Sequence, residues 1–374
     1  MPAVIAGYAR SPFTPAKKGA LARTRPDDIA AAVVDSLLSD VGIEPNQVDD
    51  LVVGCAFPEA EQGYNLARII TFLSKLPETV PGVTINRFCG SSMQAIHDAA
   101  ARINAGHGDA YIAGGVESMT RIPMTGFNPM PNPDLPPEAM TSMGVTAENL
   151  SKMHEIGREE QEQFAIESHA RATAARESGS FAEEIVPIET SAGTVDQDGC
   201  IRPGTDSETL AKLRPVFDAN GTVTAGTSSP LTDGAAFVFV CSEKFATENG
   251  LEPIARIKSA AVSGCAPEIM GIGPVEATRK ALERANLSLE DIDIVELNEA
   301  FAAQSLAVIG KLGLDPDKVN LDGGAIALGH PLGASGARIT GKAALLLKKN
   351  GGKHALATLC VGGGMGMATV LEQV

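Results

Sequence analysis

The sequence predicts an α/β fold in which two homologous halves, each with a mixed and mostly parallel sheet, flank an inserted loop domain. Short apolar or β-branched runs such as VDDLVVGCAF alternate with Ala-rich stretches such as SMQAIHDAAARINAG. This alternation is typical of buried strands with helices between them. The second observation is an internal repeat, because Ser36 to Phe57 aligns without gaps with Lys280 to Phe301. A repeat of this length indicates paired domains rather than a solenoid.

The two copies of the repeat carry the same order of elements. In each copy a helix ends, a turn follows, acidic residues precede a strand, and the strand closes on an Ala-Phe pair. A shorter match sets Val83 to Asn86 against Val319 to Asp322, and each is followed by a small or Gly-rich turn and then a helix. Few residues are identical, so coincidence is the alternative, but the shared order favours homologous halves.

The composition changes between the halves, roughly from residue 119 to residue 228, where RIPMTGFNPMPNPDLPPEAM is dense in Pro and Met. Such segments form irregular surface loops rather than strands or helices. We therefore predict an N-terminal half over 1–118 to which 229–253 returns, an inserted domain over 119–228, and a C-terminal half over 254–374. A long insertion is often a lid or substrate platform. A solvated insertion or an oligomer contact is the alternative.

The composition narrows the class of protein. The chain has 374 residues, 44% of them hydrophobic and 20% charged, which is typical of a soluble enzyme with two lobes. It has no apolar run near the roughly 20 residues that span a bilayer, and its start does not resemble a secretory signal. We expect a cytoplasmic protein without membrane insertion. The net charge of −16 and the pI of about 4.8 argue against nucleic acid as a partner.

The cysteines and histidines do not show metal-site spacing. Six cysteines are scattered without a CxxC pair, and six histidines form no HExxH motif. In a long chain without a signal peptide this indicates reduced thiols, and we expect no metal site.

Cys89 stands where a strand (VTIN) turns into an amphipathic helix. Unpaired N–H groups and the helix dipole at this position stabilise a thiolate, so Cys89 is a candidate nucleophile. Gly90 leaves room for a close approach of substrate to the backbone. A buried small residue is the alternative interpretation of Cys89.

Three further segments carry candidate groups. His330 lies in the Gly-rich turn GGAIALGHPLGASG, whose glycines indicate positive φ angles or close approaches. Cys360 ends a strand before a GGG turn, whose backbone N–H groups suit an oxyanion. The repeat places Cys360 and Cys89 at the same ends of their halves, where active sites of open α/β sheets gather. Asn298 follows the strand DIDIVEL. Each residue also has a structural alternative. His330 could lie in a capping turn, Cys360 could be a buried strand end beside a hairpin, and Asn298 could cap a helix.

Together these segments resemble the thiolase family over nearly the whole chain. The Cys-Gly-Ser-Ser turn, the NEAF box, the GGAIALGHPLGASG box and the terminal C-x-GGGMG box stand in family order and spacing. The resemblance implies a layered αβαβα fold. It also implies that Cys89 carries the acyl group, that Cys360 is the general acid and base, and that His330 activates Cys89. Asn298 would hold a water in one oxyanion hole, and the N–H groups of Cys89 and Gly362 would form the second.

The resemblance also points to ligand contacts. TAGTSSPLTDGAA resembles the pantetheine-contacting segment of the family, which implies a contact at Ser229, and LRPVFD implies Phe217 beside the adenine of CoA. Met143 matches a residue that lines the pocket near the acyl group. Ala300 and Phe301 of the NEAF box are expected at the substrate as well.

The expected reaction is CoA-dependent cleavage of 3-ketoacyl-CoA in fatty-acid β-oxidation, with CoA as a substrate and no permanently bound cofactor. Biosynthetic acetoacetyl-CoA thiolases carry His-Met-Gly where this chain has Ser142-Met143-Gly144, so the sequence is more similar to the degradative members. Synthesis of acetoacetyl-CoA is the alternative function. A decarboxylating ketoacyl synthase needs a Cys with two His, whereas this chain pairs Cys89 and Cys360 with one GHP segment. A non-catalytic lipid carrier would lack one of the four boxes, and all four are intact here. Both alternatives are therefore disfavoured. A homodimer or homotetramer is expected, as is a possible complex with a hydratase/dehydrogenase subunit.

Overall fold

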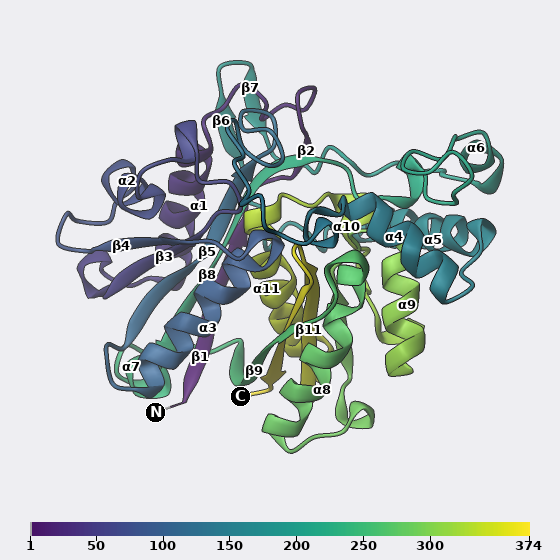
Figure 1. The fold of residues 1–374 in the computed structure, drawn as a ribbon. Helices are drawn as coiled ribbons and strands as arrows, with labels where there is room; N and C mark the ends of the chain where they lie inside the picture. Colours follow the sequence, from purple (N-terminus) through teal and green to yellow (C-terminus); the bar gives the residue numbers. More distant parts are fainter. Residues whose placement is uncertain (1) are drawn as a thin grey trace.

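The computed structural model describes residues 2–374, and its core is a single ten-stranded sheet (Figure 1). Nine strands follow the order β10-β11-β12-β9-β1-β8-β5-β3-β4, and β2 pairs with β8. The strands of this sheet are β1 (Ala3–Arg10), β2 (Thr14–Pro15), β3 (Asp50–Gly54), β4 (Gly82–Ile85), β5 (Ala110–Ser118), β8 (Thr232–Ser242), β9 (Ala255–Gly264), β10 (Ile294–Leu297), β11 (His354–Val361) and β12 (Met365–Glu372).

The sheet consists of two halves with the same pattern of strand directions. In the first half β3 is parallel to β4 and β5, and β8 is antiparallel to both β5 and β1. In the second half β10 is parallel to β11, and β12 is antiparallel to both β11 and β9. One strand of each half, β8 or β12, therefore runs against all the others. The halves join through a short antiparallel ladder between β1 and β9.

The helices form three layers around the two half-sheets. The eleven helices of the described chain are α1 (Pro26–Val41), α2 (Leu66–Leu73), α3 (Ser91–Asn104), α4 (Met143–Met153), α5 (Arg158–Glu177), α6 (Ser207–Ala211), α7 (Glu243–Glu248), α8 (Gly273–Ala285), α9 (Ala302–Leu312), α10 (Ala325–Leu328) and α11 (Leu332–Asn350). The pair α3 and α11 lies between the half-sheets, α1 and α2 cover the outside of the first, and α8 and α9 cover the outside of the second (Figure 1). The apolar faces of these layers interdigitate, so the central pair is buried over most of its length and is exposed only towards the C-terminal ends of the two helices.

The geometry supports the repeat that the sequence indicates. In the first half β3 pairs in parallel with β4, with Val52 opposite Val83. In the second half Val295 of β10 forms a parallel bridge with Val319, at the start of the shorter match. The first of these segments is followed by α3, and the second by the short α10 and then by α11. The turn before α3, with Cys89, therefore corresponds to the turn before α11, with His330. Cys360 ends β11, which corresponds to β5, so Cys89 and Cys360 share one edge of the sheet without being equivalent positions.

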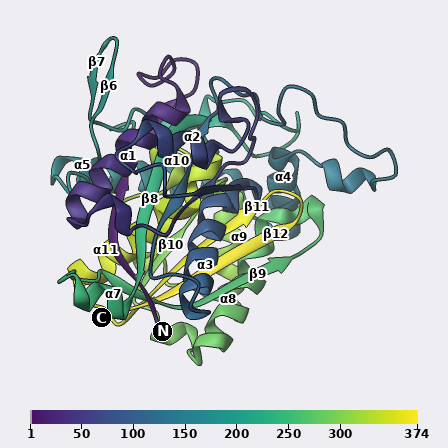
Figure 2. The ribbon, with the colours of Figure 1, turned by 90° about the vertical axis from the view of Figure 1, so that its left-hand side faces the viewer.

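The segment between β5 and β8 contains α4, α5, α6 and the hairpin of β6 (Ile188–Thr190) and β7 (Gly193–Val195). Residues 121–142 are mostly exposed and project from the body of the molecule beside α4 (Figure 2). The bounds that we predicted for the inserted domain and for the two halves stay predictions.

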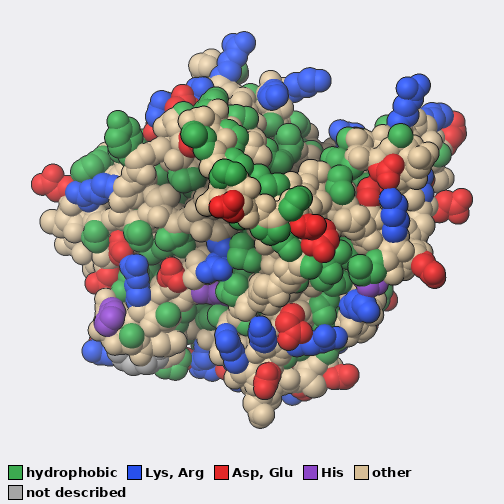
Figure 3. Space-filling model, in the orientation of Figure 1, with side chains coloured by type: hydrophobic (Ala, Val, Ile, Leu, Met, Phe, Trp, Pro, Cys, Tyr) green, Lys and Arg blue, Asp and Glu red, His purple; other side chains and the backbone are tan. Residues whose placement is uncertain are grey.

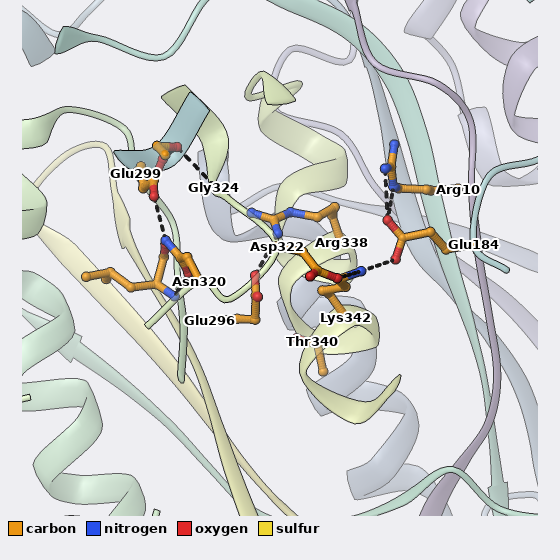
Figure 4. A network of polar contacts seen from close by, with 12 residues as sticks. Arg10, Glu184, Glu296, Glu299, Asn320, Asp322, Gly324, Arg338, Thr340 and Lys342 are labelled. Carbon is orange, nitrogen blue, oxygen red and sulfur yellow. Dashed lines mark hydrogen bonds and ion pairs between the residues drawn. The ribbon is translucent and has the colours of Figure 1, made fainter. Parts of the chain in front are cut away.

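Buried charges lie along α11 (Figure 4). The guanidinium of Arg338 donates to Glu296 at 2.6 Å, and both side chains are at most 2% exposed. One turn further along, the ammonium of Lys342 contacts Asp322 at 2.7 Å and Glu184 at 3.2 Å, and Glu184 also pairs with Arg10. Such pairs add little net stability but are costly to break singly, because the remaining charge is left buried.

The close approach of β5 to α11 is open to a test of stability. A Cβ atom at Gly115 would lie 2.1 Å from the carbonyl oxygen of Gly333 and 2.6 Å from that of Gly54. Because both neighbours are backbone, we expect Gly115→Ala to cost at least about 1–3 kcal/mol and to lower the melting temperature. Gly310→Ala in α9 is the matched control, since its Cβ would meet nothing within 4 Å. Because Ala has a higher helix propensity than Gly, Gly310→Ala should raise the free energy of unfolding by about 0.5–1 kcal/mol. Equal melting temperatures for the two variants in thermal denaturation would contradict the packing described.

Candidate active site

Cys89 lies in the 3₁₀ turn Phe88–Gly90, which leads directly into α3. The turn is held by side chains on both sides: Asn86 Oδ1 accepts the N–H of Phe88 at 2.8 Å, and Ser91 Oγ accepts the N–H of Arg87 at 2.9 Å. Phe88 adopts a φ of 44°, which is rare for a bulky residue and marks local strain. The predicted position of Cys89 at the start of a helix is thus observed, with the sulfur 2% exposed.

Gly90 has a different purpose from the one we expected. Its φ of −90° is available to any residue, and a Cβ would lie 2.4 Å from Sδ of Met367 and 2.9 Å from Cγ2 of Val361. The space at Gly90 is therefore taken by side chains of the second half rather than reserved for substrate. The missing Cβ lets the two halves approach at the nucleophile.

His330 is held by hydrogen bonds on both ring nitrogens. The Nδ1 atom contacts Ser335 Oγ, which donates to the carbonyl of Pro331 at 3.0 Å, and Nε2 lies 3.3 Å from Asn298 Nδ2. Since the Asn amide donates and the Ser hydroxyl has an acceptor of its own, this network assigns the proton to Nδ1 and leaves Nε2 as an acceptor. Gly329 precedes the ring with a φ of 106°, as the Gly-rich turn predicted.

Asn298 is fully buried and does not cap a helix, because the N-cap of α9 is Phe301. Its Oδ1 atom has no hydrogen-bond partner in the described chain. A buried amide oxygen of this kind is satisfied by an ordered water, which agrees with the role that the family resemblance implies.

Cys360 lies at the end of β11, 1% exposed, and packs among apolar residues of the second half and the insertion. The glycines after it form the turn between β11 and β12. Cys360 therefore does lie at a strand end beside a hairpin, as the structural alternative stated. The same turn also directs the N–H of Gly362 at the sulfur of Cys89, where it lowers the pKa of the thiol. The turn of the hairpin is therefore also the segment that supplies the N–H donor of Gly362.

Burial decides the protonation of the three titratable groups. It raises the pKa of Cys89 to about 11, and the N–H groups of Gly362 and Cys89 offset this only in part. Burial and the adjacent Cys89 raise the pKa of Cys360 well above its usual value. Burial and the charge of Arg338 lower the pKa of His330 to about 3. At neutral pH the site therefore holds two thiols and a neutral imidazole, which differs from our expectation of a stabilised Cys89 thiolate.

A cavity of about 470 Å³ contains most of the predicted site residues. Its walls include both sulfurs, His330 and all five predicted ligand contacts, namely Met143, Phe217, Ser229, Ala300 and Phe301. Two predicted residues lie just outside it: Asn298 stands behind His330, and Gly362 behind Cys89. The structure thus gathers all ten residues at one place.

The NEAF segment holds the residues that we predicted as ligand contacts in place. The backbone N–H and the hydroxyl of Ser229 both donate to the carbonyl of Ala300, at 3.0 and 3.1 Å. The ring of Phe217 meets that of Phe301 edge-on, with centroids 5.9 Å apart, and covers Gly144 next to Met143. These contacts join the insertion to the second half around the cavity.

Several residues at the cavity were not predicted. Met119, Met124 and Met270 line it, and Met side chains adapt readily to apolar ligands of different shape. Arg202 is the one Lys or Arg of residues 2–374 among its lining residues. Glu117 lies close enough that its charge raises the pKa of Cys89. Met119 and Met124 stand in the region of unusual Pro- and Met-rich composition, which was the only signal for any of these residues, and Met270 lies outside that region.

Other features bear on binding. Within residues 2–374, no cluster of three or more His, Cys, Asp and Glu side chains has an arrangement that would hold a metal ion. No helix of that range combines the length and apolarity needed to cross a membrane. Acidic and basic side chains are mixed over the face in Figure 3.

Comparison with protein families decides the relationship. The model of the thiolase N-terminal domain matches residues 3–244, and the model of the thiolase C-terminal domain matches residues 251–373. The chain belongs to the thiolase family. This thiolase is 47% identical over 386 residues to a protein of Bacillus subtilis named 3-ketoacyl-CoA thiolase, with 99% of each chain covered. It is 49% identical over 383 residues to a protein of the same name from Vibrio vulnificus, again with 99% of each covered.

Solved structures confirm the predicted layered fold. The acetyl-CoA acetyltransferase of Bacillus anthracis superposes with a TM-score of 0.92 at 40% identity, covering 100% of this thiolase and 99% of that chain. Human mitochondrial 3-ketoacyl-CoA thiolase gives a TM-score of 0.92 at 38% identity, with the same coverage. The fold is thus common to proteins with both names, so it does not by itself distinguish their substrates.

The protonation of Cys89 predicts how this thiolase reacts with iodoacetamide. Because only the thiolate reacts, the alkylation rate should rise about tenfold per pH unit from neutral pH towards the pKa of about 11. His330, with its pKa lowered to about 3, should add no inflection in that range. Short alkylation pulses at each pH, with the Cys89 peptide quantified by mass spectrometry, measure this profile. A plateau that begins below pH ~8, near the pKa of a free thiol, would contradict the assignment.

Proposed function

We propose that this thiolase cleaves 3-ketoacyl-CoA with CoA to give acetyl-CoA and an acyl-CoA shorter by two carbons. The observation that carries the proposal is the single cavity that brings Cys89, His330 and Cys360 together with a mostly apolar lining. The curated relatives named 3-ketoacyl-CoA thiolase, 47% and 49% identical over almost the full length, support it.

The first half-reaction transfers the acyl group to Cys89. His330 Nε2 carries no proton and lies 3.3 Å from Asn298 Nδ2 in the resting enzyme, and it takes the proton from Cys89 as the sulfur attacks C3 of the substrate. The imidazolium Nε2–H then faces the oxyanion at C3, beside the water held by Asn298. When the oxyanion collapses, the C2–C3 bond breaks and its electron pair goes to C2, as the enolate of acetyl-CoA. Cys360 donates its S–H proton to C2, and acetyl-CoA leaves.

The second half-reaction releases the acyl group. The Cys360 thiolate is strongly basic, because its burial raises its pKa, and it takes the proton of an incoming CoA thiol. The CoA sulfur attacks the thioester carbonyl, whose oxygen accepts hydrogen bonds from the N–H groups of Cys89 and Gly362. The C–S bond to Cys89 breaks, and the sulfur recovers its proton from His330. Removing one donor from such an oxyanion hole costs on the order of 100-fold in rate.

Two features favour the degradative direction and longer acyl chains. The cavity is lined by Met119, Met124 and Met270 beside Met143, more apolar wall than an acetyl group fills. The segment Ser142-Met143-Gly144 lacks the His of the biosynthetic members and lies at the cavity as expected.

Arg202 gives the phosphates of CoA a local cationic partner on a chain whose net charge is −16. Synthesis of acetoacetyl-CoA is the second candidate, favoured by the structural likeness to the acetyl-CoA acetyltransferase.

The remaining expectations are part of the proposal. We propose that this thiolase acts in the cytoplasm in fatty-acid β-oxidation, as a homodimer or homotetramer that can also form a complex with a hydratase/dehydrogenase subunit. Acyl-CoA and CoA are its ligands, and we propose no nucleic-acid partner and no permanently bound cofactor.

Replacing the two sulfurs separates their roles. Cys89→Ala should abolish thiolysis and all labelling by radioactive acetyl-CoA, because the atom that holds the acyl group is gone. Cys360→Ala should lose turnover by on the order of 100-fold or more and still take up label at Cys89. Cys241→Ala, a buried Cys of β8 away from the cavity, is the control and should keep both activities. Label bound by Cys89→Ala would sink the assignment of the nucleophile.

A series of 3-ketoacyl-CoA substrates tests the subtype. We expect kcat/KM for thiolysis to rise from acetoacetyl-CoA to medium-length substrates, because each added CH₂ buried against the Met side chains contributes about 0.8 kcal/mol. The rate of CoA consumption, followed by a thiol reagent, provides the measurement. A series that peaks at acetoacetyl-CoA would favour the biosynthetic alternative instead.

A further inference from the structure

Glu117 is a buried carboxylate that connects the two halves of the active site. It ends β5 and is 1% exposed. Its oxygens accept the backbone N–H groups of Ala56 at 2.8 Å, of Phe57 at 3.3 Å and of Gly333 at 2.9 Å. Ala56 and Phe57 follow β3 in the first half, whereas Gly333 belongs to the first turn of α11, three residues after His330. One side chain thus ties the His330 turn to the half that carries Cys89.

The partners of Glu117 identify it as a carboxylate anion. Gln62 Nε2 donates to it at 2.7 Å, and the orientation of this amide is fixed because its Oε1 accepts the N–H of Ser118 at 2.6 Å. The S–H of Cys55 lies 3.6 Å away. All the polar partners are donors, so a proton on Glu117 would have no acceptor. Burial raises the pKa of Glu117, and the bonds from Ala56, Gln62, Gly333 and Phe57 oppose that rise.

The charge of Glu117 has no counter-cation. Within the part of the chain that the structure describes, no Lys, Arg or His forms an ion pair with it. The N–H donors and the positive end of the α11 dipole stabilise the anion instead. These donors offset the charge only in part. Cys89 lies near it, because Met119, two residues after Glu117, and Leu332, beside Gly333, line the cavity that contains Cys89. Burial raises the pKa of Cys89 most, and the charge of Glu117 raises it further.

We propose that Glu117 is a positioning residue for acyl transfer: it holds the start of α11, and with it His330, against the first half, and it places a fixed negative charge behind the cavity wall near Cys89. The inference rests on the proposed function. As the C–S bond forms, charge leaves the sulfur for the carbonyl oxygen. A fixed anion near the sulfur therefore disfavours the free thiolate relative to the covalent adduct, which promotes attack in concert with proton transfer to His330.

Two cations also stand near Cys89: Arg87, two residues before it in the same turn, and Arg202, in the lining of the same cavity. Glu117 is the one charged side chain that shifts the pKa of Cys89. His330, from the turn before α11, is a neutral imidazole, and Cys360, from β11, is a neutral thiol. Arg338 acts on His330 and forms an ion pair with Glu296. Removing the charge of Glu117 therefore acts on the titration of Cys89 directly.

Glu117→Gln tests both parts of the proposal in the full-length enzyme. The carboxamide loses the charge and turns an N–H donor towards backbone N–H donors, so the start of α11 must shift. We expect kcat for thiolysis to fall on the order of 100-fold with KM for CoA close to the parent value. The pH profile of iodoacetamide alkylation at Cys89 should move to lower pH. Looser packing alone would raise the alkylation rate equally at every pH, without moving the profile.

Two further variants separate charge from contact. Glu117→Asp keeps the charge but does not reach all its donors, so kcat should fall while the alkylation profile stays near that of the parent. Glu148→Gln is the matched control. Glu148 is 2% exposed and likewise accepts backbone N–H groups, from Thr222 at 3.0 Å and Val223 at 2.8 Å, without acting on Cys89. Its alkylation profile should match that of the parent.

The outcomes distinguish this inference from the proposed function. An unchanged alkylation profile in Glu117→Gln overturns the role of the charge, and an unchanged kcat in both Glu117 variants overturns the positioning role. If the parent enzyme shows no thiolysis at all, the proposed function fails, whereas the alkylation profiles still decide whether Glu117 sets the titration of Cys89. If Glu117→Gln does not fold, Glu117→Asp with lost kcat and a parental profile supports the proposal, and parental kcat overturns it.

Discussion

The contact between α3 and α11 is the constraint on which the site depends. The two helices lie side by side between the half-sheets, and each begins at the same edge (Figure 1). Their backbones approach so closely that a Cβ at Gly336 would lie 2.4 Å from the N atom of Met93, and Ser92 Oγ accepts the N–H of Ala337 at 2.8 Å. Because Cys89 precedes one helix and His330 the other, this packing brings the proposed nucleophile and its proposed base to one cavity.

The same burial that orders the helices governs the chemistry. Cys89, Cys360 and His330 are all buried, so the thiols stay protonated and the imidazole stays neutral. Such groups react only if the proton and the developing oxyanion have partners already in place, which explains the paired ring nitrogens of His330 and the N–H of Gly362 at Cys89. The buried ion pair of Arg338 with Glu296 belongs to this arrangement, because its cation also helps to keep His330 neutral (Figure 4).

Much of the architecture and the site could be predicted from the sequence, because both are recorded in local patterns. The alternation of strands and helices, the repeat and the four boxes led to the layered fold and to ten residues that do gather at one cavity. What the sequence does not show is which atoms fill the space between distant segments. Glu117 reads as an ordinary residue after a strand, since its partners Ala56, Gln62 and Gly333 are scattered along the chain. Gly90 and the thiolate at Cys89 were interpreted wrongly for the same reason: packing by Met367 and the extent of burial are tertiary properties.

The central claim is that Cys89 holds a shortened acyl group while Cys360 handles the proton. The most direct test mixes the enzyme with 3-ketooctanoyl-CoA in the absence of free CoA, quenches in acid and determines the mass of the protein and of its Cys89 peptide. The account predicts a hexanoyl group on Cys89 and one equivalent of acetyl-CoA released per site. An intact 3-ketoacyl group on the protein, a label on Cys360, or released acetyl-CoA without any acylated Cys89 would contradict it.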